Sequence, residues 1–306
     1  MRLLQQGFSV RATVRSGPKC KKDISYLTNL PLASKKLQIC HADLNQPDSF
    51  DMAIKGCVGV FHLAHPMDDD GGKELEETVT KRAVEGMMGI LKACLKSTTV
   101  KRVIYTSSAA TILYNDKGQS VTDENTWSDL DICRNSKLVN PSYLVSKIMT
   151  ERIALEFAEE NGLDLVTLVL PVVVGPFICP TMPSSVSIAL AMILGEQELY
   201  AYLIYSYMVH IEDVASALIF LLECPNAKGR YICSSTEITI QQMHEFLSSR
   251  YQEFQMPKID QFKELASYRF SGLSSMKLLE SGFKFKFGVD EMFDGAIQCC
   301  KEKGLL

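Results

Sequence analysis

The sequence of 306 residues lacks several features that would each indicate a particular class of protein. No apolar run approaches the ~20 residues that span a bilayer, and residues 1–7 are too short and too polar for a secretory signal. The ten cysteines include no Cys-x-x-Cys pair, so no zinc site is predicted, and we expect reduced thiols in a cytoplasmic protein. The net charge of -4 provides no basic field for nucleic acid or an anionic membrane.

The sequence also lacks the glycine-rich turn, Gly-x-Gly-x-x-Gly, that brings backbone amides to the pyrophosphate of a dinucleotide. Residues 1–6 resemble the last turns of a helix that Gly7 ends, so we expect the first strand and its glycine turn to precede residue 1. The segment 56–59 does not replace that turn, because it leads into a strand rather than a helix. The missing strand would normally be central, so its absence would leave unpaired backbone between its neighbours.

The residues that are present alternate between strand and helix patterns over the first half of the chain. Strands are predicted at 8–15, 37–41, 56–64, 101–108 and 163–170, with helices that include 49–54, 73–95 and the run 148–158 that follows Tyr143 and Lys147. Short connections between them predict an α/β fold, a doubly wound parallel sheet of the Rossmann type without its first strand. After Pro171 the alternation weakens. We therefore expect a dinucleotide-binding domain over 1–170 and a smaller substrate lobe over 171–306.

Tyr143 and Lys147 carry the chemistry that the sequence indicates most directly. Residues four apart lie on one face of a helix, so a phenol and an ammonium are expected side by side. A neighbouring cation favours the phenolate and prepares the phenol to give a proton to a carbonyl oxygen as hydride arrives from a nicotinamide. Ser108 ends a buried strand and could orient that oxygen, although Ser107 competes for the role and a turn serine is the alternative. A chance Tyr-x-x-x-Lys pair on a surface helix is the other interpretation of the first two residues.

Polar residues at the carboxyl ends of the other strands indicate where a cofactor would bind. Arg15, with Lys21 and Lys22, favours NADP over NAD because a cation accommodates a 2'-phosphate, while a solvated basic loop is the alternative. Asp43 could receive the adenine amino group or could be an acid at a helix N-terminus. His62 and His65 have no carboxylate partner or metal spacing in the sequence, so structural roles are favoured for both and no metal site is predicted.

Several of these segments together resemble one family over nearly the whole chain, the extended short-chain dehydrogenase/reductases of plant flavonoid metabolism, or dihydroflavonol 4-reductase group. The resemblance rests on residues 10–15, 23–31, 42–44, 56–62, 100–108, 282–286 and 299–304. It implies that Ser108, Tyr143 and Lys147 form a catalytic triad, with Lys147 also holding the nicotinamide ribose. It further implies cofactor contacts from Arg15, Lys22, Asp43, Leu44, Leu63, Ala64, His65, the segment from Pro171 to Val174, and Ser185.

The chain departs from the family pattern in ways that bear on cofactor and substrate. The glycine motif is absent, His65 replaces a serine or threonine, and Pro141 replaces a tryptophan. Leu113 and Tyr207 stand at positions that are polar in dihydroflavonol reductases. The family implies NADPH-dependent reduction of a ketone on a flat phenolic, flavonoid or isoflavonoid substrate. The alternatives are a truncated, catalytically silent member, or a reductase of dihydroflavonols or cinnamoyl thioesters. The sequence predicts no oligomeric state.

Overall fold

The structure is a computed structural model that describes residues 1–15, 23–66, 74–116, 118, 120–136, 139–204, 207–263, 265 and 271–306. The chain forms two compact units that interleave along the sequence. The first unit contains residues 1–107, 140–168 and 215–230, and the second contains 108–139, 169–214 and 231–306. The boundary between the units is therefore not a single division at residue 170, because residues 108–139 pack with the second unit and residues 215–230 pack with the first. A substrate-binding role for residues 171–306 stays a prediction.

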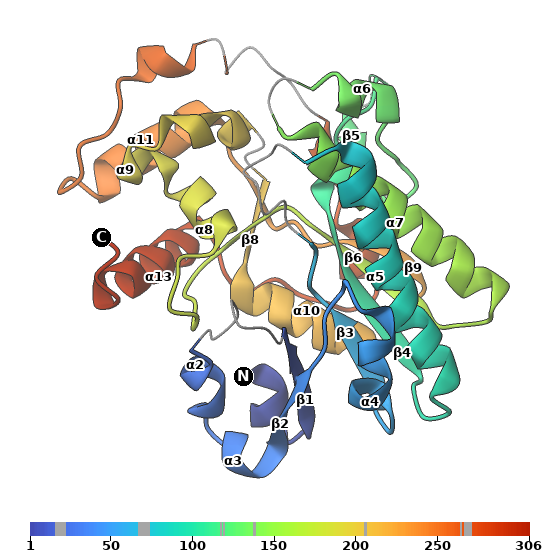
Figure 1. Ribbon diagram of the computed structural model, residues 1–306. Helices are drawn as coiled ribbons and strands as arrows, with labels where there is room; N and C mark the ends of the chain where they lie inside the picture. Colours follow the sequence, from blue (N-terminus) through green and yellow to red (C-terminus); the bar gives the residue numbers. More distant parts are fainter. Residues whose placement is uncertain are drawn as a thin grey trace. The chain divides into compact units, whose positions relative to one another are not determined.

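The first unit is built from parallel strands and the helices that connect them (Figure 1). Its strands are β1 (Val10–Val14), β2 (Leu37–His41), β3 (Gly59–His62), β4 (Arg102–Ser108), β6 (Leu165–Leu170) and β9 (Gly229–Ile232), the last three of which continue into the second unit. Its helices are α1 (Arg2–Gln5), α2 (Ser25–Thr28), α3 (Ala33–Lys36), the 3₁₀ turn η1 (Pro47–Phe50), α4 (Asp51–Ile54), α5 (Glu76–Lys96), α7 (Pro141–Glu160) and most of α10 (Ile211–Glu223).

These strands form one sheet of two strands and one of four within the described part of the chain. β1 pairs with β2 in parallel, with Val10 opposite Leu37 and Val14 opposite His41. The larger sheet has the order β3-β4-β6-β9, and β3 and β4 are parallel. The predicted parallel α/β architecture is confirmed. The predicted strand over 56–64 is shorter than expected, because Gly56 has a φ of +79° and turns the chain before β3 begins.

Helices cover both faces of the four-stranded sheet. On one face, Val103 and Tyr105 of β4 pack against α5 and α7, which lie side by side in Figure 1. On the other face, Arg102 donates to the carbonyl oxygens of Leu221 and Cys224 at the end of α10. Because side chains alternate between the faces of a strand, β4 is buried on both sides, and six of its seven residues are buried. This burial includes polar residues such as Thr106 and Ser107 as well as the apolar run from Val103 to Tyr105.

The second unit contains shorter elements around its own core. Its strands are β5 (Val121–Thr122), β7 (Val172–Val174), β8 (Tyr207–His210), β10 (Thr236–Glu237) and β11 (Gly272–Leu273). Its helices and 3₁₀ turns are η2 (Ala109–Thr111), α6 (Leu130–Arg134), α8 (Ser184–Ala189), α9 (Ala191–Leu194), η3 (Gln197–Ile204), α11 (Ile240–Arg250), η4 (Ile259–Phe262), α12 (Met276–Glu280) and α13 (Val289–Glu302). The three-stranded sheet has the order β10-β8-β7, and the core includes Val174, Met192, Met243 and Phe293.

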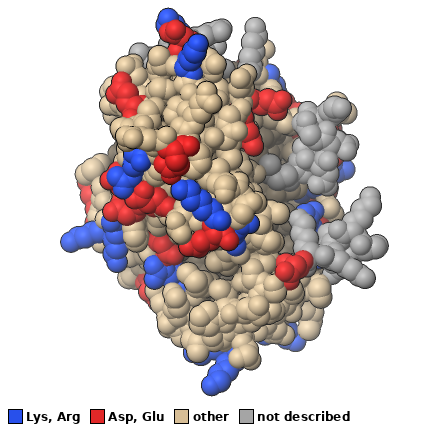
Figure 2. All heavy atoms as spheres, turned by 90° about the vertical axis from the view of Figure 1, so that its left-hand side faces the viewer, with Lys and Arg blue, Asp and Glu red and all other residues tan. Residues whose placement is uncertain are grey.

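The charged surface agrees with the small net charge of the sequence. Figure 2 shows acidic and basic side chains intermixed on the face that it presents. Ion pairs such as Arg250 with Asp290 and Asp294, and Lys301 with Glu253, hold opposite charges close together. No helix in the described part of the chain combines the length and apolar composition that a membrane crossing requires.

Close packing in the first unit predicts a large effect of one added methyl group. A Cβ at Gly89 of α5 would lie 2.7 Å from the Cα of Pro47 and 2.5 Å from its Cβ. We expect Gly89→Ala to lower the free energy of unfolding by about 1–3 kcal/mol, despite the better helix propensity of alanine, because η1 would have to move away from α5. Chemical denaturation measures this change.

Gly86→Ala is the matched control, because its added Cβ would approach Leu44, whose nearest atoms belong to a side chain at 3.0 Å. We expect a smaller loss for Gly86→Ala than for Gly89→Ala. Equal or greater stability of Gly89→Ala relative to the unaltered chain would contradict the packing described here.

Candidate active site

The helix α7 begins in a way that fixes the positions of Tyr143 and Lys147. Pro141 occupies the first turn, where its missing N–H costs nothing, and the side chain of Asn140 accepts a hydrogen bond from the Ser142 N–H at 2.9 Å. A helix that starts here places Tyr143 in its first turn and Lys147 one turn later. The predicted shared face of these two residues follows from this start.

Lys147 is almost completely buried, with 5% of the residue exposed. Its Nζ donates to the carbonyl oxygen of Thr106 at 3.2 Å and to the hydroxyl oxygen of Tyr105 at 3.4 Å. It also lies 5.2 Å from the centre of the Tyr105 ring, a cation–π distance. Burial lowers the pKa of Lys147 to about 8, and the Glu151 carboxylate opposes that change.

Two histidines beside this lysine are held in the neutral form. Burial, with the Lys147 charge, lowers the pKa of His62 to about 3 and that of His65 to about 2. His62 stacks on Tyr105 with ring centres 5.3 Å apart, and the His65 ring meets the Tyr143 ring edge-on at 5.7 Å. These contacts support structural roles for both histidines. The roles themselves stay a prediction.

A short chain of hydrogen bonds defines the tautomer of His65. The Ser146 hydroxyl donates its proton to the Tyr143 carbonyl oxygen at 2.9 Å. The Ser146 Oγ also lies 3.0 Å from Nε2 of His65. Because the Ser146 proton is engaged by Tyr143, Ser146 accepts from His65, which places the hydrogen on Nε2. His65 therefore steadies the first turn of α7 through Ser146 and packs against the Tyr143 ring. This arrangement gives a physical role to a residue that departs from the family pattern.

The two serines at the end of β4 have different partners. The Ser107 hydroxyl donates to Oε2 of Glu151 at 2.6 Å, so its proton is already engaged. The Ser108 hydroxyl caps η2 by accepting from the Ala110 N–H at 3.2 Å. The convergence of Ser108 with Tyr143 stays a prediction, because Ser108 belongs to the second unit and Tyr143 to the first.

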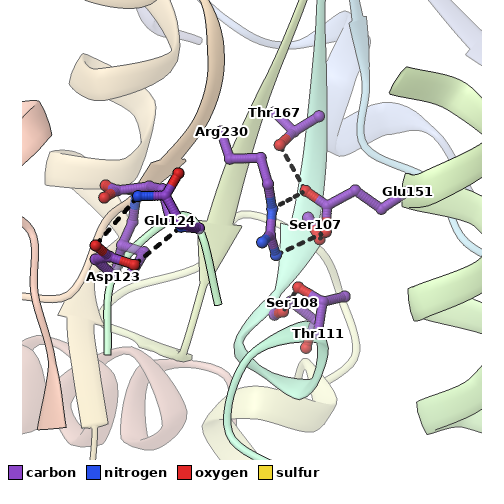
Figure 3. A network of polar contacts seen from close by, with 10 residues as sticks. Ser107, Ser108, Thr111, Asp123, Glu124, Glu151, Thr167 and Arg230 are labelled. Atoms are coloured by element: carbon purple, nitrogen blue, oxygen red, sulfur yellow. Dashed lines mark hydrogen bonds and ion pairs between the residues drawn. The ribbon is translucent and has the colours of Figure 1, made fainter. Parts of the chain in front are cut away.

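A buried network around Glu151 was not predicted from the sequence (Figure 3). The carboxylate of this α7 residue accepts hydrogen bonds from Ser107, from Thr167 at 2.5 Å, and from Arg230 at 3.2 and 3.3 Å. The spacing Lys147-x-x-x-Glu151 was the only available signal, since it places an acid on the helical face of the lysine. Arg230 is 79 residues away in the sequence and carries no local signal.

The residues expected to contact the adenosine half of a cofactor follow the strands of the first unit. Arg15 comes directly after β1 and is exposed. Asp43 follows β2, where its Oδ1 accepts from the Asn45 N–H at 2.9 Å, so part of its carboxylate serves a local turn. Leu44 packs against Gly86 of α5. Lys22, like Lys21, lies outside the described residues.

The remaining expected cofactor contacts divide between the two units. Leu63 and Ala64 are exposed beyond the end of β3 in the first unit. In the second unit, Pro171 precedes β7 and Ser185 lies half-buried on α8. Val174 is completely buried in the core of that unit. Within the described ranges, no three His, Cys, Asp or Glu side chains gather in a way that could hold a metal ion.

Comparisons with known proteins place these features in a family. The model of the NAD dependent epimerase/dehydratase family matches residues 1–233. Protein BRI1-5 ENHANCED 1 of Arabidopsis thaliana is 56% identical over all of this chain and 85% of its own length. A dihydroflavonol 4-reductase of Callistephus chinensis is 44% identical over all of this chain and 83% of its own length.

Vestitone reductase of Medicago sativa is similar in both sequence and structure. It is 49% identical over 99% of this chain and 93% of its own length. Its crystal structure matches the whole chain and 94% of the crystallised one with a TM-score of 0.86, at 47% identity. The resemblance to the dihydroflavonol 4-reductase group is confirmed. This chain belongs to the NAD dependent epimerase/dehydratase family and is one of its oxidoreductases.

Proposed function

We propose that the chain reduces the ketone of a flat phenolic substrate, of the flavonoid or isoflavonoid kind, to an alcohol, with NADPH as the cofactor. The observation that carries the proposal is the buried ammonium of Lys147 one helical turn from Tyr143. The similarity to vestitone reductase and to dihydroflavonol 4-reductases supports the substrate class. We propose residues 1–170 as mainly cofactor-binding, 171–306 as mainly substrate-binding, and a cytoplasmic location.

The residues of this chain divide the work of the reaction. A bound nicotinamide would supply the hydride. Tyr143 donates a proton to the carbonyl oxygen, and the Lys147 charge stabilises the phenolate that remains. The Ser108 hydroxyl donates to the same oxygen and orients it toward Tyr143.

The described residues fit such a cofactor at two separated points. The exposed Arg15 makes no ion pair among the residues that the structure describes, and a guanidinium matches a phosphate in geometry and charge. Lys147 would hold the nicotinamide ribose. The remaining contacts that we propose come from Lys22, Asp43, Leu44, Leu63, Ala64, His65, Tyr143, Pro171, Val174 and Ser185.

A second candidate is a chain that is catalytically silent, and one observation favours it. Residues 1–306 contain no Gly-x-Gly-x-x-Gly turn, the motif that brings backbone amides to a pyrophosphate. Other carbonyl substrates, such as dihydroflavonols or cinnamoyl thioesters, are a further alternative. Tyr207 stands at a position that is polar in dihydroflavonol reductases. Its hydroxyl donates to the Ser271 carbonyl oxygen at 3.0 Å, so its proton is engaged within the protein.

Cofactor binding separates the first two candidates. We expect fluorescence titration to show micromolar NADPH binding, and Arg15→Glu to weaken it about 10- to 100-fold because a charge-assisted contact with the 2'-phosphate is lost. Lys35→Glu is the control, since it makes the same charge change at an exposed residue of α3. Absence of NADPH binding by the unaltered chain would favour the silent candidate, and equal weakening by both variants would remove Arg15 from the site.

Loss of the Tyr143 hydroxyl tests the proton donor. We expect Tyr143→Phe to lower kcat for reduction of vestitone about 10²- to 10⁴-fold, the usual contribution of general acid catalysis, with folding unchanged. The decrease in NADPH absorbance measures the rate, and Tyr26→Phe on α2 serves as the control. A Tyr143→Phe variant with full activity would overturn this assignment.

The pH dependence of kcat follows from the buried lysine. The pKa of Lys147 is lowered to about 8 by burial, so its ammonium is present below that pH and is lost as the pH rises through it. We therefore expect a level rate of ketone reduction from pH 6 to about 7.5 and a falling rate above about 8. A rate that stays level to pH 10 would show that the Lys147 charge is not required.

A further inference from the structure

The carboxylate of Glu151 is the most completely enclosed charge in the network of Figure 3. Its side chain has 0% exposure, and Arg230 opposite has 6%. Ser107 on β4, Thr167 on β6 and Arg230 on β9 all donate to its two oxygens. A single residue of α7 therefore makes hydrogen bonds to three strands of the first unit.

Stability alone does not explain this arrangement. Removing two charges from water is costly, and a well-packed apolar pair of similar volume often stabilises a fold as well as a buried ion pair does. What an ion pair provides, and an apolar pair does not, is fixed hydrogen-bond geometry and a fixed local charge. The position of that charge relative to the reacting residues is therefore informative.

Glu151 lies one helical turn beyond Lys147 and two beyond Tyr143, on the same face of α7. The direct partners of the lysine, the Thr106 carbonyl and the Tyr105 hydroxyl, are neutral groups of β4. Glu151 is the carboxylate whose charge acts on Lys147 against the effect of burial. The titratable and charged groups around the lysine are His62, His65, Tyr105, Tyr143, Glu151 and, through Glu151, Arg230.

The network also reaches the segment that carries the predicted carbonyl-orienting hydroxyl. Ser107 donates to Glu151 and is followed directly in the chain by Ser108. The backbone of Thr106, immediately before Ser107, accepts from Lys147. The end of β4 is thus attached to α7 at two consecutive residues, once through the lysine and once through the glutamate.

We propose that Glu151 is a positioning residue for the reaction, whose carboxylate keeps Lys147 protonated and fixes α7 to the end of β4 that leads into Ser108. Ser107, Thr167 and Arg230 hold that carboxylate in place. This inference rests on the proposed function for its effect on the rate, whereas the effect on Lys147 itself requires neither cofactor nor substrate. Ser107 therefore holds the Glu151 carboxylate and does not orient the carbonyl oxygen, the role for which the sequence left Ser107 and Ser108 as alternatives.

Direct titration of Lys147 tests the proposal on the complete chain. Lysine labelled with ¹³C at Cε gives a signal that moves with the charge of the ammonium, and Lys147→Met assigns it. We expect Glu151→Gln, which keeps the shape of the side chain and removes its charge, to lower the titration midpoint of Lys147 by at least half a pH unit. Glu156→Gln, on the exposed side of the same helix, is the matched control and is expected to leave the midpoint unchanged.

Activity provides the second measurement. The falling limb of the pH–rate profile is expected to move to lower pH by the same amount in Glu151→Gln and to stay in place in Glu156→Gln. If the single variant fails to fold, the double variant Glu151→Gln with Arg230→Gln replaces it. This variant removes both charges and leaves no unpaired guanidinium, so we expect it to fold. Its midpoint is also expected to fall, because the charge that acts on Lys147 is that of Glu151.

Three results would overturn the proposal. The first is an unchanged Lys147 midpoint in a folded Glu151→Gln or double variant. The second is a loss of kcat that is uniform at every pH, which indicates a structural role only. The third is an equal shift in Glu156→Gln. An inactive unaltered chain whose Lys147 midpoint still falls on Glu151→Gln would contradict the proposed function and leave the electrostatic part of this inference intact.

Discussion

The enclosure of one ammonium group between a helix and a strand is the constraint on which the site depends. Lys147 points from α7 to the backbone of Thr106 and the hydroxyl of Tyr105, with hardly any contact with solvent. A charge in such a place interacts more strongly with its neighbours than it would in water. The same enclosure that makes the charge useful makes it costly, so the surroundings must sustain it. Two neutral histidines on one side and Glu151 one turn along the helix are the surroundings that the fold provides.

Packing of the first unit keeps this lysine in place. Helix α7 lies against α5, and both cover the face of β4 that carries Val103 and Tyr105. Gly86 and Gly89 allow Leu44 and Pro47 to approach α5 closely, which joins the segment after β2 to the same layer. On the opposite face, Arg102 binds the last carbonyls of α10. The strand that receives the Lys147 hydrogen bond is therefore supported on both faces.

The sequence predicted the elements whose signals are local. The apolar run of β6 and the shared face of Tyr143 and Lys147 follow from neighbouring residues. Features that depend on distant residues were not predictable. The Glu151–Arg230 pair joins positions 79 apart, and the partner of Ser107 emerges only when β4 and α7 are packed together. The interleaving of the two units was not predicted either, because only packing assigns residues 108–139 to the second unit and residues 215–230 to the first.

The central claim is that Ser108, Tyr143 and Lys147 act on a single carbonyl group. A crystal structure of the chain with NADP and the alcohol product tests it most directly. The account predicts that the Ser108 and Tyr143 hydroxyls both lie about 2.6–3.2 Å from the same product oxygen, with Lys147 beside the nicotinamide ribose. Side chains of these three residues directed toward separate surfaces, with the alcohol bound elsewhere, would contradict it.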